Sequence, residues 1–169
     1  MISGDEHVQE PARPFDGTGK AMIGRRKTAL VVDPAEPIRR LAAAALRGLQ
    51  FERIILVEGA EEAEETLVTV AIDLALVDWE LGPRSGFDLA ADIRVGRVPP
   101  RSDVPIIMMT WKAEPRSVLA AQALRLNGLI VKPLSRAALE RKVTAVLDPQ
   151  AAVVPPIKAK PKRFLGQPL

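Results

Sequence analysis

The sequence predicts an α/β protein built on a doubly wound parallel sheet of five strands. Five short apolar runs alternate along the chain with segments whose apolar residues recur at helical spacing. Each run is almost continuously apolar, which is typical of strands that are covered on both faces. The connections are short, and this alternation favours parallel strands joined by right-handed crossovers.

The strands and the first two helices follow in order from these patterns. The apolar runs predict strands at 28–32, 53–57, 73–77, 105–109 and 129–131. The first helix is indicated by apolar residues at helical spacing, namely Ile38, Leu41, Ala42, Ala45, Leu46 and Leu49. In the second helix, AEEAEETLVTVA, a strongly acidic face lies opposite Ala63, Leu67 and Val70.

Capping residues indicate where the remaining helices begin and end. Ser85 stands three residues before an aspartate, which is an N-terminal capping signal, and Pro115 suits the first turn of a helix. Ser135 can cap the last helix, and Asn127-Gly128 suits the end of the helix before it. The sequence therefore predicts five helices in all.

The two ends of the chain differ in composition from the middle. Residues 1–27 lack an apolar period, so we expect a flexible N-terminal arm followed by a folded domain over 28–147. The segment 148–169 is rich in Pro and Lys and is expected to be extended and disordered. The basic excess lies in this tail, which is a candidate docking peptide, and we expect no direct DNA-binding domain.

Composition excludes several classes of site. The chain has no cysteine, which excludes disulfides, thiolate metal sites and cysteine nucleophiles. Its single histidine, His7, lies in the predicted arm, so Ser/His triads and histidine metal sites are not expected in the folded domain. No apolar run approaches the ~18 to 20 residues of a membrane-spanning helix. We therefore expect a cytoplasmic protein without a membrane span.

Four polar residues each come directly after an apolar run. Asp33 follows ALVV, Asp78 follows LALV, Thr110 follows IIMM and Lys132 follows LIV. In a doubly wound sheet, ligands bind beyond the carboxyl ends of the strands, where the winding direction reverses. We therefore expect two carboxylates, a hydroxyl and an ammonium group to converge in one crevice.

These residues and their surroundings resemble the receiver domains of two-component response regulators, in the single-domain, chemotaxis-type form. The similarity covers 28–147. Its markers are LVVD at 30–33, LVDW at 76–79 with Gly86 eight residues after Asp78, IIMMT at 106–110 and VKP at 131–133. The resemblance implies a flavodoxin-like sheet with the strand order 2-1-3-4-5 and five helices.

The resemblance also implies the chemistry of the crevice. Asp78 would be the phosphoacceptor, and its carboxylate would attack the phosphorus of a phosphohistidine or of a small phosphodonor. Asp33, Asp78 and the backbone carbonyl of Glu80 would hold Mg²⁺, which takes oxygen ligands and offsets the charge of the transferring group. Lys132 and Thr110 would contact the phosphoryl oxygens.

The implied function is that of a phosphorylation-dependent signalling switch that acts through protein–protein interaction. A histidine kinase or phosphotransfer protein would supply the phosphoryl group, and a downstream protein would read residues 115–147. The added phosphate brings about −1.5 to −2 charges, which would draw Thr110 inward and re-order the following loop. Catalysis would be limited to self-phosphorylation and to hydrolysis of the protein's own aspartyl phosphate, so we do not expect an enzyme in the usual sense.

The sequence departs from the receiver pattern around the crevice. Receivers normally have two adjacent acidic residues after the first strand, but Pro34 follows Asp33, so a metal ligand is missing. The metal should bind more weakly unless Glu36 or the side chain of Glu80 supplies an oxygen, and we expect Glu80 to do so because it lies next to the acceptor. Trp79, next to the acceptor, is expected to be a packing residue. Pro133 matches a family proline whose preceding peptide bond is often cis.

Two further departures concern the switch itself. Trp111 occupies a position where the family usually has a small residue, so its ring is expected to restrict the entry of phosphodonors or of attacking water. Leu129 replaces the usual Tyr or Phe, so the family's aromatic rotamer switch cannot operate at that position. Trp111 is a candidate substitute for it.

The sequence leaves two alternatives open. In a receiver-fold adaptor that binds partners without phosphorylation, Pro34 and Trp111 would have weakened the chemistry, although the presence of Asp78 and Lys132 argues against this. A Mg²⁺-dependent phosphatase or nucleotide-binding α/β protein would need a glycine-rich phosphate loop, and VVDPAEP after the first strand contains no glycine.

Overall fold

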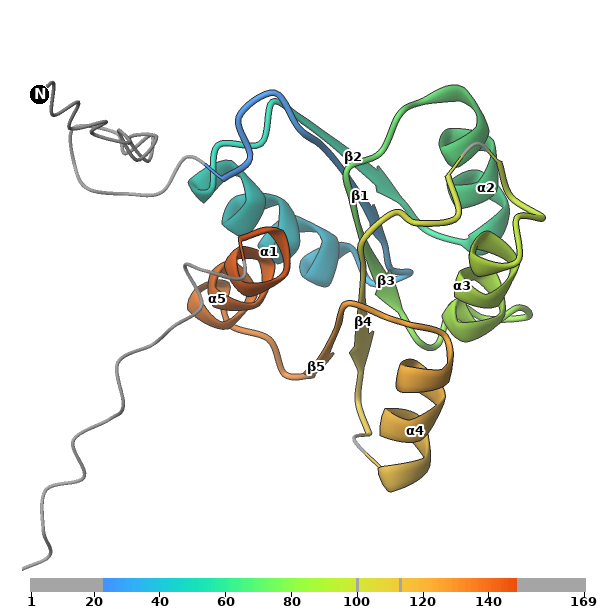
Figure 1. Ribbon diagram of the computed structural model, residues 1–169. Coiled ribbons are helices and arrows are strands. Elements are labelled where there is room, and N and C mark those ends of the chain that lie inside the picture. The colour runs from blue at the N-terminus through green and yellow to red at the C-terminus, as the bar shows by residue number, and fades with distance from the viewer. Residues whose placement is uncertain (1–22, 100, 113, 149–169) are drawn as a thin grey trace, which may run out of the picture.

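The computed structural model describes residues 23–99, 101–112 and 114–148, in which strands and helices alternate (Figure 1). The strands are β1 (Thr28–Val32), β2 (Arg53–Val57), β3 (Leu74–Asp78), β4 (Ile106–Thr110) and β5 (Gly128–Val131). The helices are α1 (Glu36–Gly48), α2 (Ala60–Thr69), α3 (Gly86–Arg94), α4 (Pro115–Ala123) and α5 (Arg136–Leu147).

The strands form one sheet in the order β2-β1-β3-β4-β5, and every neighbouring pair is parallel. Helices α1 and α5 cover one face, whereas α2, α3 and α4 lie on the other (Figure 1). The predicted flavodoxin-like fold is therefore confirmed. Because the winding reverses between β1 and β3, the carboxyl ends of these two central strands mark the expected ligand crevice.

Alternate residues of the central strands pack into two separate apolar layers. One layer contains Leu30, Val32, Ala75, Val77, Ile106 and Met108, and the other contains Ala29, Val31, Leu74, Leu76, Ile107 and Met109. All of these side chains are at most 1% exposed. Helices on both faces thus explain why the strands are continuously apolar, and the packed layers hold the strand ends in fixed positions.

Three helix starts agree with the capping residues in the sequence. The Ser85 hydroxyl accepts a hydrogen bond from the Asp88 amide at 3.1 Å, and the Asp88 carboxylate accepts one from the Ser85 amide at 3.3 Å. Ser135 accepts a hydrogen bond from the Ala138 amide at 3.2 Å, and Pro115 opens α4. These caps satisfy amides that have no partner within the helix.

The predicted end of α4 at Asn127-Gly128 is wrong. The helix ends at Ala123, and Arg125 takes the left-handed φ of 50° that follows it. The side-chain oxygen of Asn127 instead accepts a hydrogen bond from the Ile106 amide at 3.0 Å, and Gly128 opens β5. Asn127 therefore connects the starts of β4 and β5. In the sequence, the pair Asn127-Gly128 has the same composition as a helix C-cap, which explains the wrong prediction.

Strands β3 and β4 begin and end one residue later than predicted. Asp78 and Thr110 are the last residues of their strands, because Asp78 pairs with Met109 and Thr110 pairs with Val131 in the sheet. The Trp79 amide adds a hydrogen bond to the Met109 carbonyl at 2.8 Å. The backbones of both predicted site residues are thus held by ladder hydrogen bonds.

Most of the predicted arm and tail, residues 1–22 and 149–169, lies outside the described residues. The last part of the predicted arm forms a turn at 23–26, and the Gly24 amide donates a hydrogen bond to the Leu49 carbonyl at 2.8 Å. This bond ties the start of the described chain to the end of α1.

Candidate functional site

Four of the five buried polar or charged side chains in the described residues are those predicted at the strand ends. The exposed fractions are 0% for Asp33, 3% for Asp78, 4% for Thr110 and 4% for Lys132. The fifth is Arg39, which is 9% exposed. Charged groups are rarely buried unless they are paired, so this cluster requires compensating contacts within it.

Lys132 brings the two carboxylates together. Its ammonium nitrogen donates a hydrogen bond to Asp33 Oδ2 at 2.7 Å and lies 3.0 Å from Asp78 Oδ1. The contact with Asp78 is an ion pair without hydrogen-bond geometry, since Asp78 Oδ1 is buried and has no hydrogen-bond partner among the described residues. One cation therefore balances two anions, and one carboxylate oxygen is left unsatisfied.

The surroundings of Asp78 disfavour its negative charge. Burial is the largest influence and raises the pKa of the Asp78 carboxyl above its ordinary value of 3.8. Contact with Lys132 opposes this rise, the charge of Asp33 adds to it, and a hydrogen bond from the backbone of Glu80 opposes it. The Asp78 carboxylate is buried, and its negative charge is only partly neutralised by Lys132. Contact with another positive or electrophilic centre would therefore be favourable.

Asp33 is fixed by its own loop and by Arg39, whose burial the sequence analysis missed. Asp33 Oδ1 accepts a hydrogen bond from the Ala35 amide at 2.8 Å. Arg39 Nη1 donates to the carbonyls of Asp33 at 2.7 Å and Pro34 at 2.9 Å, while Nη2 pairs with Glu58 at 2.7 Å. The connection from β1 to α1 is thereby held in place behind the site.

Arg39 is buried, although the arginine side chains of a surface helix usually lie on its solvent-exposed face. Arg39 lies three residues before Ala42 and seven before Leu46, so it belongs to the buried stripe of α1. This spacing is the signal that would have revealed it. Its charge is satisfied by carbonyls and by Glu58 and does not require water.

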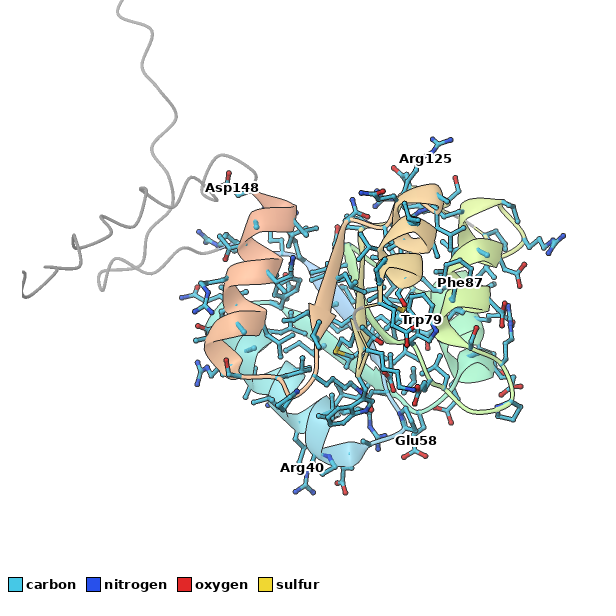
Figure 2. The ribbon with its side chains drawn as sticks, turned by 90° about the horizontal axis from the view of Figure 1, so that it is seen from below. Arg40, Glu58, Trp79, Phe87, Arg125 and Asp148 are labelled. Carbon is cyan, nitrogen blue, oxygen red and sulfur yellow. The ribbon has the colours of Figure 1, made fainter. Side chains whose placement is uncertain are left out.

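The β3–α3 connection closes tightly over the backbone of Asp78. The Gly86 amide donates a hydrogen bond to the Trp79 carbonyl at 2.9 Å, and a Cβ on Gly86 would lie only 1.9 Å from the Asp78 carbonyl oxygen. Trp79 stacks on Phe87 with ring centroids 5.2 Å apart (Figure 2). Trp79 is therefore a packing residue beside the site, and glycine is required at 86 by close approach of the backbone.

An ion-pair cluster holds the same connection from outside. Arg84 lies in the loop and bridges Glu64 of α2 to Asp92 of α3, with a distance of 2.5 Å to Glu64. Asp92 also pairs with Arg97 at 2.8 Å. The loop that carries Glu80 is thus tied to two helices, whereas the Glu80 side chain itself is exposed.

On the β4–β5 side, Thr110 and Trp111 form the start of the loop. The Thr110 hydroxyl donates a hydrogen bond to the Lys112 carbonyl and accepts one from the Lys112 amide, both at 3.1 Å. Trp111 is 54% exposed, and its ring centroid lies 5.6 Å from the Lys132 ammonium nitrogen. In this structure the hydroxyl contacts its own loop, while the indole reaches the site.

The remaining residues that the sequence singled out lie next to the site. Leu129 is half-buried against the apolar layer that faces α2 and α3. Pro133 is exposed, and the Lys132–Pro133 peptide bond is cis. A groove of about 450 Å³ runs between the two loops, with Trp79 and Glu80 on one side and Thr110 and Lys112 on the other. Of the four residues at the strand ends, only Thr110 lines this groove.

The oxygen donors of the crevice fit a hard divalent cation. Asp33 and Asp78 supply carboxylate oxygens, and the buried, unpartnered Asp78 Oδ1 is an atom that a cation would satisfy. Among the residues that the structure describes, no group of three or more His, Cys, Asp or Glu side chains could hold a metal. The side chain of Glu80 therefore does not join the two aspartates in this arrangement.

Comparison with known proteins agrees with the fold. The response regulator receiver domain family matches residues 29–144. The phosphate regulon transcriptional regulatory protein PhoB of Pseudomonas aeruginosa is 36% identical over 126 residues, which cover 75% of this chain and 53% of that protein. The chemotaxis protein CheY1 of Helicobacter pylori is 32% identical over 119 residues, which cover 70% of this chain and 94% of that protein.

The solved structure of the Vibrio cholerae chemotaxis protein CheY4 has the same fold, with a TM-score of 0.65 at 21% identity, and the match covers 71% of this chain and 98% of that one. The chain thus spans about half the length of the PhoB relative and nearly all of the chemotaxis relatives. No helix in the described ranges is long and apolar enough to cross a membrane.

Receiver domains are signalling switches and not enzymes in the usual sense. With the family matched over most of its length, the chain belongs to the response regulator receiver domains, the phosphorylation-dependent switches of two-component signalling.

Proposed function

We propose that Asp78 is the residue that accepts the phosphoryl group. The observation that supports this most directly is the buried Asp33–Lys132–Asp78 cluster, in which one oxygen of Asp78 has no hydrogen-bond partner. A phosphohistidine of a histidine kinase or phosphotransfer protein would be the donor. An oxygen of Asp78 bonds to the phosphorus as the bond from phosphorus to the imidazole nitrogen breaks, and the imidazole leaves with that electron pair.

The residues around Asp78 have separate tasks in this proposal. Lys132 contributes a fixed positive charge next to the acceptor, where it offsets the charge of the incoming phosphoryl oxygens. Thr110 exchanges its hydrogen bonds with Lys112 for one to the phosphoryl group, which alters the loop after β4. Water later hydrolyses the acyl phosphate, so phosphotransfer and dephosphorylation occur on the protein itself.

Mg²⁺ belongs to the same proposal. Asp33, Asp78 and the backbone carbonyl of Glu80 would hold the ion, whose charge offsets that of the transferring phosphoryl group. Pro34 stands where receivers usually have a second acidic residue after Asp33. Among the described residues, only Asp33 and Asp78 therefore offer buried carboxylates to the ion. We expect the exposed Glu80 side chain to turn inward and contribute when the ion binds.

Replacing Glu80 with alanine is therefore expected to weaken Mg²⁺ binding severalfold without changing the fold. Titration with MgCl₂ followed by tryptophan fluorescence measures this affinity, because Trp79 lies between Asp78 and Glu80. Glu61→Ala, which removes an exposed glutamate from α2, is the matched control and should leave the affinity unchanged. An unaltered affinity in Glu80→Ala would show that only its backbone takes part.

The face formed by α4, β5 and α5 is the proposed surface for a downstream protein, over residues 115–147. Four of the exposed large apolar side chains lie on it or at its margin, namely Trp111, Val118, Leu119 and Val131. Such a group marks a contact surface more strongly than scattered apolar residues do. The predicted docking role of the tail concerns residues outside the described ranges, and a cytoplasmic location fits a chain without cysteine.

Two-dimensional amide spectra with Mg²⁺ and beryllofluoride, an analogue of the phosphoryl group, test the proposal. We expect resonances of Thr110, Lys132 and the β4–α4 loop to shift in the wild type and to stay in place in Asp78→Asn. Asp103→Asn, which removes an exposed carboxylate at the opposite end of β4, should respond like the wild type. If no spectrum changes, the receiver-fold adaptor that binds without phosphate is the correct description.

A further inference from the structure

Trp111 contacts Lys132, and this contact is separate from the strand pairing of the sheet and from the ion pairs of Lys132 with Asp33 and Asp78. The indole is 54% exposed and lies at the outer end of β4. Its ring centroid is 5.6 Å from the Lys132 ammonium nitrogen, whose side chain is only 2% exposed. A buried ammonium is thus covered on its outer side by the face of an aromatic ring, a contact that is favourable because the ring face is electronegative.

The carboxylates alone do not fix the ammonium next to Asp78. Lys132 donates its hydrogen bond to Asp33, and its contact with Asp78 is longer and lacks hydrogen-bond geometry. An ammonium between two competing anions can shift toward either of them. A third contact, with the ring of Trp111, adds a restraint on the position of the ammonium group next to Asp78.

The sheet and the loop hold the ring in the required position. Thr110 and Val131 are paired across the β4–β5 ladder, so the next residues, Trp111 and Lys132, are neighbours as well. The two hydrogen bonds between the Thr110 hydroxyl and the backbone of Lys112 close the turn that carries the indole. The ring is therefore attached to a constrained segment although much of its surface faces solvent.

We propose that Trp111 is a positioning residue for phosphoryl transfer, whose ring face holds the Lys132 ammonium at the acceptor. The inference rests on the proposed function, since it assigns Lys132 the task of stabilising the incoming phosphoryl group. It differs from a steric role, in which the ring would only obstruct the crevice. The two roles predict opposite effects when the ring is removed.

Three substitutions of Trp111 distinguish an electrostatic role of its ring from a steric one. Trp111→Phe keeps an aromatic face, Trp111→Leu keeps a bulky apolar group without one, and Trp111→Ala removes both. We measure the rate of phosphorylation by acetyl phosphate with Mg²⁺. The leucine and alanine variants should be slower by about two- to thirtyfold, the range that corresponds to a cation–π contact, and phenylalanine should restore most of the rate. Val68→Ala, another exposed apolar truncation, should have the wild-type rate.

A second measurement detects the contact without any phosphorylation. The ring current of the indole should shift the ε-CH₂ proton resonances of Lys132 upfield in the wild type and in Trp111→Phe, and this shift should vanish in Trp111→Leu. The leucine and alanine variants should remain folded and should lose no more stability than the loss of this one contact explains, because the side chain is largely exposed.

The outcomes that would overturn the inference are distinct from failure of the proposed function. If the wild type is phosphorylated on Asp78 but leucine matches tryptophan, or if leucine and alanine react faster, Trp111 does not position Lys132. An absent ring-current shift in the wild type contradicts the contact itself. If the wild type is not phosphorylated at all, the proposed function fails and the positioning role fails with it.

Discussion

Replacing Lys132 with methionine is expected to destabilise the protein by about 3 to 5 kcal/mol at neutral pH, which is typical when one partner of a buried ion pair is removed. The substitution keeps the length of the side chain but leaves the carboxylates of Asp33 and Asp78 buried, close together and without a cation. Urea unfolding in the presence of a chelator, followed by circular dichroism, measures the change in the free energy of unfolding without a contribution from Mg²⁺.

The pH dependence of this loss identifies its cause. The pKa of Asp78 is already raised by burial, and Lys132 opposes that rise, so removing Lys132 raises it further. A carboxyl group whose pKa is higher in the folded state than in the unfolded state stabilises the folded protein when it is protonated. This stabilisation is complete at a pH below the pKa of the unfolded state, and it is lost as the pH rises through the pKa of the folded state. The deficit of Lys132→Met should therefore be greatest at neutral pH and shrink as the pH falls toward 3.8, the ordinary pKa of the group.

Two further variants serve as controls for the lysine substitution. Lys112→Met removes an exposed lysine from the neighbouring loop and should change the stability by less than about 0.5 kcal/mol. Asp33→Asn combined with Lys132→Met should recover part of the lost stability, because only one buried carboxylate then remains. A pH-independent deficit would attribute the loss to packing of the lysine stem and not to unpaired charge.

Replacing Gly86 with alanine is expected to destabilise the protein by about 3 kcal/mol, at the upper end of what overpacking usually costs. The new Cβ would lie 1.9 Å from the Asp78 carbonyl oxygen and 2.9 Å from Val77 Cγ1. The first of these is a backbone atom that is held in the sheet, so it cannot move aside cheaply. The strain acts next to the proposed acceptor, so phosphorylation of Asp78 should slow as well.

Gly59→Ala is the matched control for this prediction. Gly59 also precedes a helix, but its φ of −139° suits any residue, and the nearest atom to an added Cβ is Glu61 Oε2 at 3.9 Å. Its effect should stay within about 1 kcal/mol, the range of changes at a helix N-cap. If both glycine variants have equal stability, close approach of the backbone does not explain the glycine at 86.

The sequence was sufficient for the sheet because the deciding signals are local or follow from general topology. Continuous apolar runs located all five strands to within one residue, and the carboxyl-end rule brought Asp33, Asp78 and Lys132 into one crevice. The roles of these residues in phosphoryl transfer remain predictions, since the structure tests their geometry and not their chemistry.

What the sequence did not predict depends on contacts between distant segments. The spacing of Arg39 in α1 indicates that it is buried, but not that its guanidinium group pairs with the carbonyls of the β1–α1 connection and with Glu58, which follows β2. Asn127 was misinterpreted because its partner, the Ile106 amide, lies 21 residues away. The unequal sharing of Lys132 between two aspartates is likewise set by distances that no spacing in the sequence encodes.

The strand to which each site residue is attached determines which side of the crevice can move when a ligand binds. Asp33 and Asp78 belong to β1 and β3, and each of these strands has a neighbour on both sides. Lys132 follows β5, which lies at the margin of the sheet and pairs only with β4. When Lys132 and Asp78 are both drawn toward a common ligand, β3, which carries Asp78, therefore resists displacement more than β5, which precedes Lys132. Displacement should accumulate in the outer two strands, so the distortion is directed toward the surface where a partner can sense it.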